Sequence, residues 1–153
     1  ALLEARGFTE EDFARSHPGG RLGRRLLLLI EDIMHSGDEI PVVKSSASIR
    51  EALDEITRKG MGMTAVVNDE NKVQGIFTDG DLRRILDTDI DIKTTVINDV
   101  MTSGCKTANQ HILAAEALQI LQSHKINGLL IVNHDNILKG AINMHDLLRA
   151  GVV

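Results

Sequence analysis

The sequence predicts an α/β fold of the α+β kind, in which two β-α-β-β-α repeats pack together with pseudo-twofold symmetry. The stretch GIFTDGDLRR at 75–84 returns as GAINMHDLLR at 140–149, and the triplet EAL at 51–53 returns at 116–118. Both pairs are separated by 65 residues, so the register is constant. A constant register over two well-separated motifs indicates an internal duplication.

The first repeat shows the hydrophobic periods of both strands and helices. We expect strands at 40–43, 63–67 and 73–77, and helices at 48–59 and 79–86. Ser48 and Glu51 form a capping box at the start of the first helix, and Gly60 ends it. Residues 69–71 separate two apolar runs, which predicts a hairpin turn.

The second repeat predicts the same order of elements. We expect a short strand at 105–108, a helix at 112–123, strands at 129–132 and 137–142, and a last helix at 144–150. Each repeat is too small to bury its sheet alone, so the two are expected to pack face to face. A cleft between such halves is a common place for a small ligand.

The pattern of the N-terminal residues predicts the C-terminal edge of an upstream domain. Residues 2–6 have the pattern of a helix tail closed by Gly7, and Pro18 interrupts a second helical pattern. We expect residues 1–32 to be the edge of an upstream domain with a linker. The first repeat is then expected at 33–92 and the second at 93–153.

Composition excludes several classes of protein. The net charge is −5, which argues against a nucleic-acid partner, and no apolar run reaches the roughly 18 residues of a membrane span. The single cysteine, Cys105, excludes an internal disulfide and favours a reducing compartment, so we expect a cytoplasmic location. The histidines lack metal-ligand spacing, so no metal is expected.

The residues Thr78, Asp79 and Asp81 follow the third strand of repeat one. The carboxylates of Asp79 and Asp81 already compensate the helix dipole and would repel a phosphate. A hydrogen bond from a carboxylate to a sugar hydroxyl, in contrast, is favourable and worth about 1.5–3 kcal/mol. We therefore predict that Asp81 binds a ribose diol. A phosphate would lie near Arg83, Arg84 or a basic residue of the other repeat. Alternatively, Thr78 or Asp79 merely caps the helix.

In repeat two the matching residues are Asn143 and Asp146, with His145 between them. Asn143 is a strong N-cap, so a purely structural role gains weight there. If one cleft is occupied, we expect the cleft of Thr78 and Asp81. Further candidates for the cleft wall come from the first strands of repeat one: Ile40, Met61, Gly62 and Met63.

A second candidate site is His17, in the segment SHPGG at 16–20. Pro18 holds this histidine extended, and the glycines allow a ligand to approach closely. Nearby arginines would suit a phosphorylated substrate. The alternative is a solvated histidine in a helix-breaking linker.

Together these motifs resemble known families. The two repeats ending in GIFTDGDLRR and GAINMHDLLR resemble a tandem CBS domain pair over residues 33–153, although Asn143 departs from the Thr/Ser-x-x-Asp pattern. The stretch FARSHPGGRLGRRLL at 13–27 resembles the junction between a sugar isomerase (SIS) domain and a CBS pair in the arabinose 5-phosphate isomerase family. This implies that His17 belongs to the isomerase site of a parent enzyme, and that the present chain alone is inactive.

The resemblance implies a regulatory module that binds a nucleotide or a nucleotide sugar and requires no cofactor. An adenine nucleotide and CMP-Kdo, the activated sugar of lipopolysaccharide synthesis, are the implied ligands. The implied partners are the upstream SIS domain and further copies of the chain. The alternative is a structural oligomerisation module with empty clefts. We expect Asp81→Ala to abolish nucleotide binding with little change in melting temperature.

Overall fold

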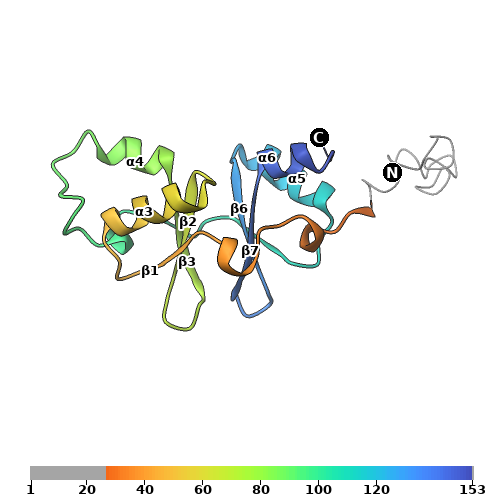
Figure 1. Ribbon diagram of the computed structural model, residues 1–153, viewed down its shortest axis with the longest axis horizontal. Coiled ribbons are helices and arrows are strands. Elements are labelled where there is room, and N and C mark those ends of the chain that lie inside the picture. Colours follow the sequence, from red (N-terminus) through yellow and green to blue (C-terminus); the bar gives the residue numbers. More distant parts are fainter. Residues whose placement is uncertain (1–26, 153) are drawn as a thin grey trace, which may run out of the picture.

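Two small sheets lie side by side in the computed structural model, which describes residues 27–152 (Figure 1). Repeat one consists of β1 (Val42–Lys44), α3 (Ile49–Lys59), β2 (Met63–Val67), β3 (Val73–Thr78) and α4 (Asp79–Ile85), and β4 (Thr102–Ser103) completes its sheet. Repeat two consists of β5 (Thr107–Asn109), α5 (Ala114–His124), β6 (Gly128–Val132), β7 (Leu138–Asn143) and α6 (Met144–Arg149). Three short 3-10 helices lie in the connections: η3 (Ile30–Asp32), η4 (Gly37–Glu39) and η5 (Ile97–Asp99).

The two sheets have the same topology, which confirms the predicted duplication. The strand orders are β1-β2-β3-β4 and β5-β6-β7, with a parallel first pair and an antiparallel second pair in each. Even the irregularity in the hairpin recurs, between Val66 and Val67 and again between Ile131 and Val132. The predicted mixed α/β fold with two β-α-β-β-α repeats is therefore correct.

Several element boundaries differ from the prediction. The first strand of each repeat begins later than expected, at Val42 and Thr107, because only the part that pairs with the following strand counts as sheet. Helix α5 begins at Ala114 and not at 112, since Ile112 N–H donates to Asn109 in a turn. The strand β4 was not predicted.

Reciprocal contacts relate the repeats by an approximate twofold axis. The side chain of Met63, at the start of β2, lies against Gly128, the equivalent position in β6, where an added Cβ would lie 2.3 Å from the Met63 sulfur. At the hairpin tips Val73 N–H donates to Asn136 O, and Leu138 N–H donates to Asn71 O, at 3.1 Å each. Contacts that are mutual in this way are the mark of a twofold interface.

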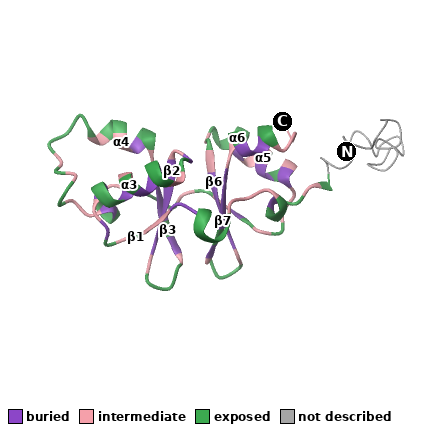
Figure 2. Ribbon diagram, viewed as in Figure 1, coloured by how far each residue is buried: buried purple, intermediate pink, exposed green. Residues whose placement is uncertain are grey.

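Figure 2 shows that buried residues lie mainly along the strands. The buried apolar residues form three clusters that follow the arrangement of the two repeats. One cluster fills the seam between the two sheets and includes Ile40, Met63 and Leu130. Each of the other two lies between a sheet and its own helices. No helix among residues 27–152 is long and apolar enough to cross a membrane.

The segment 28–36 packs on repeat two, although it precedes repeat one in the sequence (Figure 1). Ile30 is fully buried there, and His35 forms a two-way backbone bridge with Ala141 at 2.9 and 3.0 Å. The strand β4 occupies the corresponding place on repeat one, where Thr102 pairs with Ile76. Each repeat therefore receives an edge segment from the linker that precedes the other repeat. We call 28–36 and 101–103 the exchanged edge segments.

Candidate ligand-binding cleft

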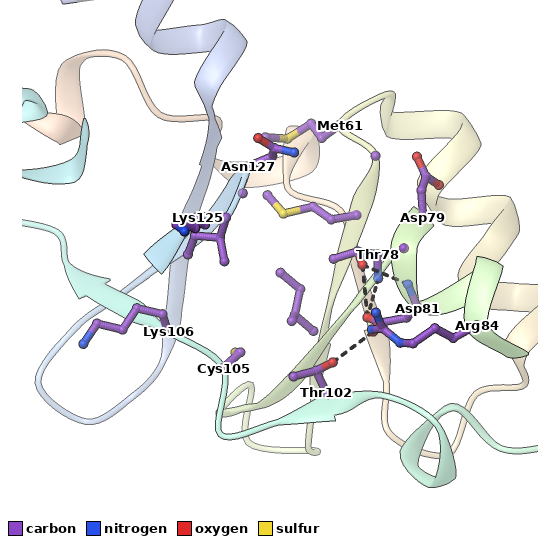
Figure 3. A pocket seen from close by; sticks show the side chains of 16 residues that line it. Met61, Thr78, Asp79, Asp81, Arg84, Thr102, Cys105, Lys106, Lys125 and Asn127 are labelled. Carbon is purple, nitrogen blue, oxygen red and sulfur yellow. Dashed lines mark hydrogen bonds and ion pairs between the residues drawn. The ribbon is translucent and has the colours of Figure 1, made fainter. Parts of the chain in front are cut away.

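A cavity of about 540 Å³ lies between the two repeats (Figure 3). This volume is within the usual range for small-molecule sites and is sufficient for a nucleotide. It is lined from both repeats and from the linker between them, by Met61, Gly62, Met63, Ile76, Thr78, Asp79, Gly80, Asp81, Arg84, Thr102, Cys105, Lys106, Lys125, Ile126, Asn127 and Gly128.

One side of the cavity is formed by Thr78, Asp79 and Asp81, which we call the acidic wall. Thr78 caps helix α4, because its Oγ1 accepts from Asp81 N–H at 3.2 Å. In return, Oδ2 of Asp81 accepts from Thr78 N–H at 2.9 Å and from the Thr78 hydroxyl at 3.1 Å. This capping box fixes the direction of both side chains.

The second oxygen of Asp81 is also bonded. Oδ1 accepts a hydrogen bond from the Thr102 hydroxyl at 3.0 Å and forms an ion pair with Arg84. Asp81 is 5% exposed, so all of these bonds are largely shielded from water. The structure therefore gives Asp81 a structural role in α4, and it changes our expectation that Asp81→Ala would leave stability unaffected. A ligand diol would have to replace Thr102 and Arg84 at Oδ1.

Asp79 is the accessible carboxylate of the acidic wall. Its residue is exposed, and its side chain makes no hydrogen bond or ion pair within residues 27–152. Its Oδ2 lies 3.4 Å from where a Cβ of Gly62 would be, so Gly62 leaves it open on that side. Gly62 also has φ of 73°, which favours glycine. Asp79 can accept ligand hydroxyls without breaking an existing contact.

The side facing the acidic wall comes from repeat two and carries positive charge. Lys106 precedes β5, and Lys125 ends α5 in the left-handed conformation with φ of 53°. In Figure 3 both lie across the cavity from Asp81, and the Lys106 side chain extends away from it. Neither lysine forms an ion pair with another described residue.

Some of the predicted site residues come together in this cavity and others do not. Met61, Gly62, Met63, Thr78, Asp79, Asp81 and Arg84 line it, whereas Arg83, Ile40, Asn143, His145 and Asp146 do not. Ile40 is buried in the seam between the sheets, and Arg83 is exposed on α4. His17 lies outside the described residues.

Residues 126–128 were not among the predicted site residues. They are the repeat-two equivalents of 61–63 at the same separation of 65, so the twofold relation could have identified them. Thr102 and Cys105 belong to the linker between the repeats, where no sequence pattern marks them. Burial raises the pKa of the Cys105 thiol, which makes it a weak nucleophile.

In repeat two the same capping box recurs with different neighbours. Asn143 caps α6, and Asp146 Oδ2 accepts from Asn143 N–H at 2.9 Å. Oδ1 of Asp146 is paired with Arg149 and lies 2.9 Å from Nε2 of His35. Thus His35, from one exchanged edge segment, takes the place that Thr102 has in repeat one. Within the described part of the chain no three His, Cys, Asp or Glu residues are grouped to hold a metal.

The chain is similar to known families in sequence. The CBS domain family matches residues 30–88 and again residues 97–153. Over its whole length the chain is 59% identical to "Arabinose 5-phosphate isomerase KdsD" of Pseudomonas aeruginosa, covering 47% of that protein. It is 57% identical to the protein of the same name from Escherichia coli K12, covering 46%. The chain thus spans about half the length of these curated relatives.

Solved structures share the fold. A CBSX2 crystal structure in complex with AMP matches with a TM-score of 0.69 and 23% identity, over 82% of this chain and 96% of the other. The CBS domain pair of MJ0100, in complex with 5-methylthioadenosine and S-adenosyl-L-methionine, matches with a TM-score of 0.72 and 21% identity, over 80% and 94%. At these identities the likeness concerns the fold alone.

Proposed function

We propose that this chain, which belongs to the CBS domain family, is a regulatory module that binds a nucleotide or a nucleotide sugar between its two repeats. The observation that carries the proposal is the cavity itself, which is bounded by carboxylates and hydroxyls on one side and by lysines on the other. Relatives of the same fold hold AMP and adenosyl compounds, which supports a nucleotide-type ligand.

Ligand hydroxyls would bind at the acidic wall. Asp79 is open to accept them, and Oδ1 of Asp81 becomes available if Thr102 and Arg84 both move aside. A carboxylate–hydroxyl bond is charge-assisted and worth about 1.5–3 kcal/mol. The base would lie against apolar side chains that line the same cavity, among them Met61, Ile76 and Ile126.

The chain would belong to a longer cytoplasmic arabinose 5-phosphate isomerase, since the curated relatives have that name and about twice its length. The catalytic SIS domain would precede the described residues, and His17 would act in its active site. The chain alone would then be inactive. Its ligand would be CMP-Kdo, an end product of the pathway, or an adenine nucleotide, and a coupling of about 1–3 kcal/mol would suffice for feedback control.

A thermal-stability screen with AMP, ATP, CMP and CMP-Kdo tests the proposal. A ligand that binds only the folded chain stabilises it by about 2.7 kcal/mol at a hundred times its Kd. We expect stabilisation that weakens in Asp79→Asn but persists in Asp69→Asn, an exposed carboxylate of a hairpin turn outside the cavity. Absence of any nucleotide effect at millimolar concentration would refute it. Incubation with arabinose 5-phosphate should yield no product.

The second candidate function is assembly of the oligomer with an empty cavity. It is favoured by two exposed leucines near the ends of equivalent helices, Leu86 at 65% and Leu148 at 51% exposure. Sedimentation of the wild type and of a Leu86→Ser, Leu148→Ser variant tests this function. Assembly is favoured over regulation if the wild type is a dimer, the double variant is a monomer, and nucleotides have no effect on stability.

A further inference from the structure

Each exchanged edge segment carries a methionine whose side chain lies directly on a glycine of the neighbouring strand. A Cβ on Gly75 would lie 2.8 Å from the sulfur of Met101 and 2.6 Å from the backbone oxygen of Thr102. Met34 lies in the same way against Gly140 in repeat two. The thioether of Met101 is therefore part of the contact that joins residues 101–103 to β3.

The strand next to Met101 is short and borders the cavity. β4 has only two residues, and it pairs with β3 alone. The hydroxyl of Thr102 also donates to Oδ1 of the buried Asp81 at 3.0 Å, and both residues line the cavity (Figure 3). A strand of two residues depends on its neighbours for stability, so a change at Met101 reaches the cavity wall through the next residue.

Met101 is accessible to a small oxidant, and the thiol of the chain is a poor competitor. Three of the five methionines are half-buried, namely Met34, Met101 and Met144, and two are buried, namely Met61 and Met63. Burial raises the pKa of the Cys105 thiol, and the thiolate is the form that reacts with peroxides. A thioether has no proton to lose, so its oxidation does not wait for deprotonation.

We propose that Met101 is an oxidation site, at which a hydroperoxide releases β4 from the sheet and opens the cavity beside Asp81. A lone pair of the Met101 sulfur attacks the terminal oxygen of the hydroperoxide. The S–O bond forms while the O–O bond breaks, the sulfur loses two electrons, and the peroxide leaves as an alcohol or, from hydrogen peroxide, as water. Methionine sulfoxide reductases reverse this step.

Oxidation weakens the contact because a sulfoxide is polar. The Met101 side chain packs against the apolar cluster of repeat one, which includes Phe77 and Ile97. An apolar cluster offers no hydrogen-bond donors, and burying a polar oxygen there is unfavourable. The sulfoxide reaches water when residues 101–103 move away from β3, which also breaks the bond from Thr102 to Asp81. Oδ1 of Asp81 then has only Arg84 as a partner, whether or not a ligand is present.

Limited oxidation of the whole chain with hydrogen peroxide tests the site. Peptide mass spectrometry should show Met101 converted to the sulfoxide at least about fivefold faster than Met61 and Met63, which react only when the fold opens. Amide hydrogen exchange of residues 75–76 and 102–103 should rise at least about tenfold in the oxidised chains. Treatment with methionine sulfoxide reductases should restore the slow exchange.

The variant Met101→Leu keeps the apolar volume and removes the sulfur, so residues 102–103 should exchange slowly both before and after peroxide. Met34→Leu is the matched control, because it removes the equivalent methionine and should leave the response at 102–103 unchanged. Slow oxidation of Met101, exchange that does not follow its oxidised fraction, or a full response in Met101→Leu would each overturn the proposal. The first two measurements use the wild type and decide the question if Met101→Leu fails to fold.

Discussion

The two repeats have the same arrangement of strands and helices, but the buried aspartate that caps the last helix of each repeat has different contacts. Asp81 and Asp146 each cap the last helix of their repeat, at 5% and 4% exposure, and each pairs with an arginine three residues on. The third partner differs, because Thr102 bonds to Asp81 whereas His35 lies beside Asp146. Both of these partners come from the exchanged edge segments. The helix caps are thus the same in both repeats. The contacts that differ come from the exchanged edge segments, which belong to the linkers and not to the repeats.

A second difference lies in the first helix of each repeat. In repeat one the buried Glu55 of α3 accepts from Val42 N–H of β1 at 3.0 Å and pairs with Lys59 and Arg58. The equivalent position in repeat two is Ile120, which packs against the apolar cluster of that repeat. Helix α3 is therefore joined to its sheet by charge in addition to apolar contacts, whereas α5 has an apolar contact at the same position. The following changes test how far the two repeats behave alike.

The largest effect is expected at the glycines below the exchanged edge segments. A Cβ on Gly75 would lie 2.6 Å from the backbone oxygen of Thr102, whereas on Gly140 the nearest backbone atom, His35 O, is 3.0 Å away and the closer Met34 sulfur can move. We expect Gly75→Ala to cost about 3 kcal/mol and Gly140→Ala about 1 kcal/mol in urea unfolding. Gly80→Ala, whose nearest contact is 3.6 Å, is the control and should be neutral or stabilise by up to about 1 kcal/mol, because alanine favours a helix more than glycine does. Equal losses at both glycines would contradict the comparison.

The ion pair of Glu55 should make repeat one sensitive to acid. Burial raises the pKa of Glu55, but hydrogen bonds from Lys59 and Val42 N–H, with Arg58 nearby, outweigh it and leave the pKa below its usual range. A lowered pKa in the folded state means that the stabilisation is present above about pH 4.5 and is lost as the pH falls through the folded value.

We therefore expect Glu55→Gln to cost about 2 kcal/mol at pH 7 and progressively less below about pH 4. Unfolding curves of the wild type and the variant at several pH values measure the difference. Glu51→Gln, on the same helix but exposed, provides the control. A difference that does not change with pH would show that the charge of Glu55 is not what joins α3 to β1.

Removal of the charge from the two capping aspartates should have similar and smaller effects. Asp81→Asn and Asp146→Asn each keep an acceptor for the cap but weaken the contacts of Oδ1, so about 1 kcal/mol is expected in both. Chemical denaturation measures both values. A much larger loss at Asp146 would show that the His35 contact stabilises more than the Thr102 contact does.

An effect of similar size but opposite sign is expected at Lys125. Lys125→Gly gives repeat two the residue that repeat one has at Gly60, so it should relieve left-handed strain and stabilise by about 1 kcal/mol. The melting temperature measures this. Gly60→Ala should destabilise by a similar amount. If Lys125→Gly is destabilising, the lysine contributes contacts to the fold that offset its backbone conformation.

Much of the fold could be predicted because its signals are local. The cap at Ser48, whose Oγ accepts from Glu51 N–H, and the left-handed cap at Gly60 are as expected, since both depend on neighbouring residues, but the Glu51 carboxylate does not complete the predicted capping box. At the start of α5, Leu113 replaces the capping serine, and only the Glu116 carboxylate accepts from Leu113 N–H. Because the sequence has no capping side chain at Leu113, the start predicted for that helix was two residues too early.

The remaining features depend on contacts between distant segments. The strand β4 has two residues and exists only because Gly75 and Ile76 offer a free edge. The side chain of Asn71 donates to Leu138 O and that of Asn136 donates to Val73 O, and these two bonds form only once both hairpin tips are in place. For the cavity, the sequence predicted Thr78, Asp79 and Asp81, which line it, together with a basic residue that was either Arg83, Arg84 or one of the other repeat. It could not identify Lys106 and Lys125, because that requires the packing of one repeat on the other.

The exchanged edge segments have a consequence for how the chain can be divided. A cut between residues 92 and 93 would give a first half without the β4 that covers Gly75. The same cut would give a second half without Ile30 in its core. Neither piece is a complete folding unit. A gene encoding a single repeat would have to place its leading segment on a neighbouring molecule, so the smallest ancestor compatible with this architecture is a strand-swapped homodimer later fused into one polypeptide.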